Sequence, residues 1–187
     1  MRMPLLLLLG LALVAPARGV LAQHRELGAH EHGRGTLNIA LEGARLSMEL
    51  EAPGADIVGF EHPAKTRQQK AAVEKAKKQL SAPQTLFQLP PSAGCVLQEA
   101  KVAIESEDHD HAAKQEPGGH DAGEHSAFNA QYAFDCKAPA NITAIELGYF
   151  RVFGGAQKLD INVVTAKAQT KLEATRAKPR VDLAGIW

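Results

Sequence analysis

Histidine and carboxylate side chains gather between residues 105 and 127, in a pattern that suits metal binding. Four histidines lie there among seven acids, and Lys114 is the only basic residue. Imidazole nitrogens are ligands for zinc, copper and nickel, and carboxylates complete their coordination shells. The candidate ligands in this segment are Asp108, His109, Asp110, His111, His120, Asp121, Glu124 and His125.

The same segment has little means of folding by itself. Pro117, Gly118 and Gly119 interrupt any helix, and large apolar side chains are absent. Such a segment cannot offset its ordering entropy by burial, and long loops inside compact domains tend to be functional. We therefore predict a mobile insertion at residues 105–127 that binds metal.

A second group of histidines lies near the N-terminus. His30 and His32 are two residues apart and directly precede a predicted strand, so on an extended chain both side chains project to one face. This arrangement predicts a two-histidine chelate that needs further ligands from elsewhere. His62, in a loop after the first hairpin, is a third candidate. The alternatives are a hydrogen-bonded strand edge for the pair and a packed turn for His62.

The first residues have the order of a secretory signal peptide. Arg2 precedes an apolar run at residues 5–14, and small residues follow at Val20 and Ala22. We expect cleavage after Ala22, with a cut after Ala17 as the alternative. The apolar run is shorter than the roughly 20 residues that a bilayer requires. We therefore expect a periplasmic protein without a membrane span once residues 1–22 are removed.

The remaining residues 23–187 are enough for one domain. Without Arg2 and Arg18 the chain has 19 Lys and Arg against 21 Asp and Glu, a net charge of −2. This balance gives no support for nucleic-acid binding, which requires a clustered basic surface.

Two cysteines in an exported chain predict one disulfide, Cys95–Cys136. It should stabilise the fold by roughly 4 kcal/mol in the chain-entropy model. If both sulfurs are bonded to each other, a metal ion must be held by nitrogen and oxygen. A thiolate metal site is the alternative.

The elements that position these residues are mostly strands. Alternation of apolar and polar residues predicts strands at 36–42, 46–50, 96–104, 128–136 and 158–164. In the third of them Val96 is expected to share the inward face with Ala100. Residues 65–80 predict a surface helix, because Thr66 and Gln69 form a capping-box pattern before good helix formers.

Together these elements predict a β-rich α+β fold, with a single antiparallel sheet, one clear surface helix and a disordered His/acid-rich insertion. If strands 96–104 and 128–136 pair antiparallel, Cys95 and Cys136 are adjacent at one end. The insertion then lies at the opposite end of that hairpin.

Four short motifs resemble a known family. They are His30-Glu31-His32-Gly33, Ala55-Asp56-Ile57-Val58-Gly59-Phe60-Glu61-His62, Ala93-Gly94-Cys95 and Phe134-Asp135-Cys136. With them, most of residues 23–187 resembles the ZrgA family of periplasmic zinc-binding proteins. The resemblance implies that the chain binds Zn²⁺ in the periplasm and supports zinc acquisition alongside an ABC-type importer.

The leading hypothesis is thus a zinc-binding accessory protein that captures or buffers the ion and hands it to a zinc ABC importer or its solute-binding protein. One alternative is a periplasmic copper or nickel protein, since nitrogen ligands also bind these metals. Another is an interaction module whose acidic loop contacts a basic partner without metal. No His-x-x-x-His pair, nucleophile elbow or Cys-x-x-Cys motif is present, so we expect no catalytic residues and no enzyme.

Overall fold

A computed structural model describes residues 31–106 and 125–186. The large sheet has the strand order β4-β5-β2-β1-β7-β8, and a small sheet has the order β3-β6-β9. The strands of the large sheet are β1 (Arg34–Glu42), β2 (Arg45–Pro53), β4 (Cys95–Ser106), β5 (Ser126–Cys136), β7 (Lys158–Thr165) and β8 (Gln169–Thr175). Those of the small sheet are β3 (Phe87–Gln88), β6 (Ala144–Leu147) and β9 (Arg180–Asp182).

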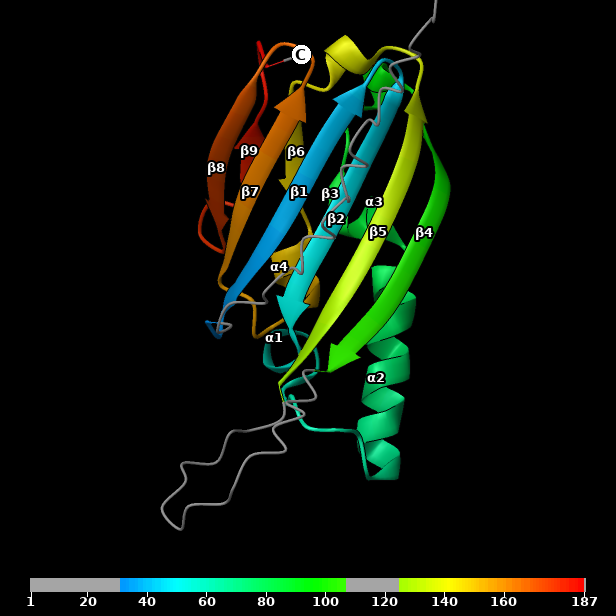
Figure 1. The fold of residues 1–187 in the computed structure, drawn as a ribbon, viewed down its shortest axis with the longest axis vertical. Coiled ribbons are helices and arrows are strands. Elements are labelled where there is room, and N and C mark those ends of the chain that lie inside the picture. Colours follow the sequence, from blue (N-terminus) through cyan, green and yellow to red (C-terminus); the bar gives the residue numbers. More distant parts are fainter. Residues whose placement is uncertain (1–30, 107–124, 187) are drawn as a thin grey trace, which may run out of the picture.

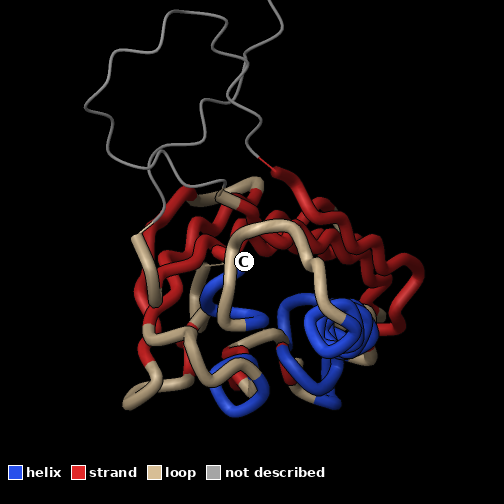
Figure 2. The backbone as a smooth tube through the Cα atoms, turned by 90° about the horizontal axis from the view of Figure 1, so that it is seen from below, coloured by secondary structure: helices blue, strands red, loops and turns tan. Residues whose placement is uncertain are grey.

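Helices cover one side of the large sheet (Figures 1 and 2). They are α1 (Gly54–Val58), α2 (Arg67–Leu80), α3 (Pro83–Leu86) and α4 (Tyr149–Val152), with 3-10 turns at Pro91–Ala93 and Pro139–Asn141. Within the described ranges, none of the helices is both long and apolar enough to cross a membrane.

The predicted β-rich α+β class is confirmed, and the sheet is mainly antiparallel. Two features differ from a single antiparallel sheet. β1 and β7 pair in parallel, and the three short strands form a second sheet. The parallel pair places the start of β7 beside the start of β1, next to the N-terminal segment.

Alternation along the strands separates a buried face from an outer face. In β1, for example, Leu37, Ile39 and Leu41 are buried while the residues between them are partly exposed. The buried faces of β1, β2, β5 and β7 pack with the helices in one apolar core. That burial is the main source of stability of the sheet.

The predicted surface helix is α2. Its capping box is formed, because the Thr66 hydroxyl accepts from the Gln69 N–H and the Gln69 side chain accepts from the Thr66 N–H. At its other end, the buried Tyr132 hydroxyl donates to the Leu80 carbonyl at 2.9 Å. These contacts fix the helix at both ends, and its start lies next to residues 61–65.

The hairpin of β4 and β5 has the predicted disulfide at one end. Cys95 and Cys136 are register partners, and their sulfurs are bonded at 2.09 Å. The prediction that Val96 faces the core is wrong, because a β-bulge between Leu97 and Glu99 shifts the alternation. Val96 is 55% exposed as a result. The other end of the hairpin, where the insertion begins and ends, lies beside α1 (Figure 1).

Candidate metal-binding site

The buried carboxylate of Glu61 lies between two histidines from distant parts of the chain. Glu61 belongs to the connection between α1 and α2, and only 10% of its side chain is exposed. His125 Nδ1 lies 2.6 Å from Glu61 Oε2, at hydrogen-bond distance. His32 Nε2 lies 3.3 Å from Glu61 Oε1, at ion-pair distance. The fold thus joins the N-terminal segment and the end of the insertion at one carboxylate.

Burial and the two imidazoles have opposite effects on Glu61. Burial raises the pKa of its carboxyl, but the His125 and His32 imidazoles together outweigh burial and hold the pKa below its ordinary value. Glu61 Oε1 is nevertheless buried without a hydrogen bond of good geometry. A buried carboxylate oxygen in this state is costly unless a cation or donor approaches it. The position therefore suits a metal cation.

Gly54 lets the start of β5 approach the segment that carries Glu61. A Cβ at Gly54 would lie 2.6 Å from Ser126 Oγ and 2.7 Å from the Phe60 carbonyl oxygen. Ser126 directly follows His125, and Phe60 directly precedes Glu61. The missing side chain at the start of α1 therefore allows His125 and Glu61 to meet.

Gly33 fixes the N-terminal segment that carries His32. Its N–H donates to Asp56 Oδ1 at 2.7 Å, and its carbonyl accepts from the N–H groups of Gln157 and Lys158, each at 2.9 Å. Its φ of 84° lies in the left-handed region that favours glycine. His32, the preceding residue, is thereby held against Glu61.

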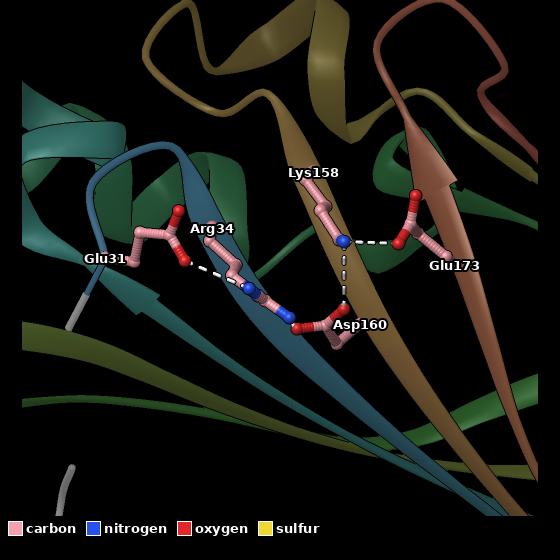
Figure 3. A network of polar contacts seen from close by, with 5 residues as sticks. All are labelled: Glu31, Arg34, Lys158, Asp160 and Glu173. Carbon is pink, nitrogen blue, oxygen red and sulfur yellow. Dashed lines mark hydrogen bonds and ion pairs between the residues drawn. The ribbon is translucent and has the colours of Figure 1, made fainter. Parts of the chain in front are cut away.

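Charged side chains on the outer face of the sheet hold the same segment (Figure 3). Arg34 donates to Glu31 at 2.9 Å and to Asp160 at 2.5 Å. Lys158 lies 3.7 Å from Asp160 and also pairs with Glu173. Exposed pairs contribute at most about 1 kcal/mol each. Their main effect is to align the start of β1 with β7 and β8.

His62 lies next to Glu61 in the sequence, but other groups hold its ring. The ring stacks on Phe60 with centroids 5.1 Å apart. Its Nδ1 is 3.0 Å from the Pro63 carbonyl oxygen, and its Nε2 is 3.4 Å from the amide nitrogen of Gln69. A carbonyl oxygen can only accept, so Nδ1 is the donor to Pro63, and Nε2 is the ring nitrogen left to bind a metal.

A small hollow of about 110 Å³ lies beside Glu61, with walls that include Val73 of α2, Ile104 of β4 and Phe128 of β5. A larger hollow of about 440 Å³ lies on the outer face of the sheet and has no histidine or cysteine in its walls. The chemistry-bearing residues are therefore at the end of the sheet beside α1, away from the larger hollow.

The structure brings together two of the predicted ligands, His32 and His125, and places His62 close by in the sequence and in the fold. All of the other predicted ligands lie outside the described residues. These are His30, Asp108, His109, Asp110, His111, His120, Asp121 and Glu124. Glu61 and Asp56 were missed as site residues, although each is an acid within an otherwise largely apolar stretch, which is a sign of burial.

In the described part of the chain, no three or more His, Cys, Asp or Glu side chains already surround a point that could hold an ion. His32 and His125 instead surround the Glu61 carboxylate, with one ring nitrogen of each directed at it. His125 Nδ1 contacts Glu61 Oε2 directly, so a metal ion bound between these two atoms would have to replace that contact. Metal binding at this group would release protons and would draw on further ligands.

Comparison with known proteins agrees with this chemistry. The family model described as "ZrgA family zinc uptake protein" matches residues 29–183. No curated protein gives a significant match to the chain. The match includes both segments that meet at Glu61, and it covers well over half of the sequence. The chain belongs to the ZrgA family of zinc uptake proteins.

Proposed function

We propose that this protein binds Zn²⁺ in the periplasm and supports its uptake, as a buffer or as a donor to an ABC-type importer. The observation that carries the proposal is the Glu61 carboxylate, which is buried between His32 and His125. Two imidazoles and one carboxylate form a common zinc ligand set, in which a fourth position is filled from elsewhere. Membership in a zinc uptake family supports the identity of the ion.

The proposed site combines both histidine groups of the sequence. Glu61, His32 and His125 form the part of it that already meets in the structure, and His62 joins through Nε2 when Gln69 moves aside. The remaining ligands come from His30 and from the insertion. In the insertion they are Asp108, His109, Asp110, His111, His120, Asp121 and Glu124.

The role is binding rather than catalysis. A zinc hydrolase requires rigid ligands, an open coordination position and a general base in a dry pocket. In this protein both imidazoles are substantially exposed, His32 at 65% and His125 at 45% of the side chain. Exposed ligands allow the ion to enter and leave, as a carrier requires.

The proposed periplasmic location is supported by the Cys95–Cys136 disulfide and by the zinc uptake family, and it agrees with the signal peptide that the sequence predicts. Disulfides form and persist in the periplasm and are rare in the cytosol. Cell fractionation tests the location directly, and a chain that stays in the cytosol would contradict it.

Calorimetric titration of the purified protein with zinc tests the binding proposal. We expect His32→Ala and His125→Ala each to weaken binding at least tenfold, because each removes one nitrogen ligand. Replacing residues 107–124 by a short Gly-Ser linker should lower the stoichiometry or affinity further but leave binding at Glu61 measurable. Parallel titrations with Cu²⁺ and Ni²⁺ measure selectivity. Unchanged zinc binding in both histidine variants would contradict the proposal.

A further inference from the structure

Asp56 is a buried carboxylate that the proposed zinc ligand set does not use. It is 4% exposed, and it is the most deeply buried charged side chain in the described part of the chain. Its Oδ2 atom has no hydrogen-bond partner there. Burial raises the pKa of this carboxyl, and the Gly33 N–H and the His32 imidazole only partly oppose that effect. A carboxylate buried at such a cost in stability calls for a structural reason.

The side-chain hydrogen bond that Asp56 makes to Gly33 points to that reason. Its Oδ1 accepts from the backbone N–H of Gly33 at 2.7 Å, and Gly33 directly follows His32. The Gly33 carbonyl is bound on the other side by the N–H groups of Gln157 and Lys158. Both backbone polar groups of this one residue are therefore held, and the direction of the segment before it is fixed.

The supports of Asp56 are themselves rigid. Gly155 packs so closely on α1 that a Cβ there would lie 2.6 Å from Asp56 Cα. The loop that contains Gly155 is held by Arg176, whose guanidinium donates to four backbone carbonyls, those of Phe150, Phe153, Gly154 and Ala156. Asp56 Oδ1, which accepts the Gly33 N–H, therefore belongs to a helix that is tightly packed against the rest of the protein.

We propose that Asp56 is the positioning residue for zinc binding, which holds His32 at Glu61 by accepting the Gly33 N–H. The inference rests on the proposed zinc site. His32 is 65% exposed, so its own side chain is weakly held. The hydrogen bond from the adjacent Gly33 N–H to Asp56 fixes the backbone from which this side chain extends. A ligand that is already in place loses less entropy when the ion binds. Residues that orient metal ligands typically change affinity by about 10- to 100-fold.

Three substitutions separate positioning from direct coordination by the carboxylate. Asp56→Asn keeps an oxygen that accepts the Gly33 N–H but removes the charge. Asp56→Ala and Asp56→Leu both remove the acceptor. The leucine also fills a similar volume, so it provides a folded variant if the cavity left by alanine destabilises the protein too far. We expect zinc affinity within about threefold of wild type for Asp56→Asn and about 10- to 100-fold weaker for the other two.

A double-mutant cycle with His32→Ala shows whether Asp56 acts through that histidine. In the His32→Ala background, Asp56→Leu should have no further effect on zinc affinity. Hydrogen exchange in the metal-free protein supplies a second readout, since the Gly33 amide should exchange faster in Asp56→Leu while the amides of β1 keep their protection.

The outcomes are distinct. If Asp56→Asn binds zinc as weakly as Asp56→Leu, the carboxylate acts through its charge and the positioning role is overturned. If the effects of Asp56→Leu and His32→Ala are additive, Asp56 does not act through His32. If His32→Ala and His125→Ala themselves bind zinc normally, the zinc site fails and the inference fails with it.

Discussion

Replacing Glu61 by glutamine is the sharpest test of the site. Glutamine has nearly the same shape but lacks the charge and one acceptor, so the packing of the α1–α2 connection should survive. In the metal-free protein Glu61 contacts His125 at 2.6 Å and His32 at 3.3 Å. Partly exposed pairs of this kind contribute about 0.2–1 kcal/mol each, and removal of a buried charge offsets part of that loss. The free energy of unfolding should therefore change by no more than about 1 kcal/mol.

The effect on zinc binding should be much larger. Among the described residues, Glu61 is the carboxylate that contacts both imidazoles, and its charge would balance the cation in a position of low exposure. Groups that only orient a ligand already change metal affinity by about 10- to 100-fold. We expect Glu61→Gln to lower zinc affinity by about 100-fold, the upper end of this range, which equals about 2.8 kcal/mol of binding free energy.

Titration calorimetry with a competing chelator measures this loss, and thermal melting of the metal-free protein checks the fold. Glu51→Gln is the matched control, because Glu51 lies on β2 at the same end of the sheet but on its outer face. The control should bind zinc like the wild type. Zinc binding by Glu61→Gln with wild-type affinity and stoichiometry would refute the assignment, as would an equal loss in Glu51→Gln.

Three further predictions follow from the same structure. Gly54→Ala should destabilise the protein by about 1–3 kcal/mol and weaken zinc binding, because its Cβ would lie 2.6 Å from Ser126 Oγ; chemical denaturation and calorimetry measure the two effects. Reduction of the Cys95–Cys136 disulfide should lower the free energy of unfolding by about 4 kcal/mol. Zinc affinity should not change, because the disulfide lies at the end of the hairpin opposite to the histidine site. Thermal melting and zinc titration in reductant measure the two effects. Burial raises the pKa of Asp56 above its ordinary 3.8, so its charge destabilises the fold above the raised value and has no effect well below 3.8. Asp56→Asn should therefore melt higher than wild type at pH 7, with a difference that disappears as the pH falls toward 3.8.

Elements with a clear local signal were predictable from the sequence. The alternation around Leu37 and Leu46 shows two paired strands, and the Thr66 and Gln69 pattern marks the start of α2. The pairing of Cys95 with Cys136 was predicted because they are the two cysteines of an exported chain, and it is confirmed. For the strands and the helix a few neighbouring residues determine the outcome, so periodicity and capping chemistry suffice; for the disulfide the number of cysteines suffices.

Features that depend on distant contacts were not predictable. Nothing local to β1 and β7 indicates that they pair in parallel. The bulge that exposes Val96 depends on how β4 fits against β5. Likewise, an acid in a loop is usually a solvated side chain, and Glu61 gains its role only because β5 and the N-terminal segment converge on it. The histidines could be recognised from the sequence as candidate ligands. That His32 and His125 share Glu61 as a partner could be seen only from the structure.

The disulfide and the histidine site lie at opposite ends of the β4–β5 hairpin, and this separation has a functional consequence. Backbone pairing of β5 with both β4 and β2 fixes the register of these strands, and it does so without requiring the bond between Cys95 and Cys136. With the register fixed, Ser126 packs on Gly54 at the other end, and His125 meets Glu61. The position of His125 is therefore set by the sheet, not by the sequence of residues 107–124. Changes in the length or histidine content of that segment should alter zinc capacity while the contact between His125 and Glu61 persists.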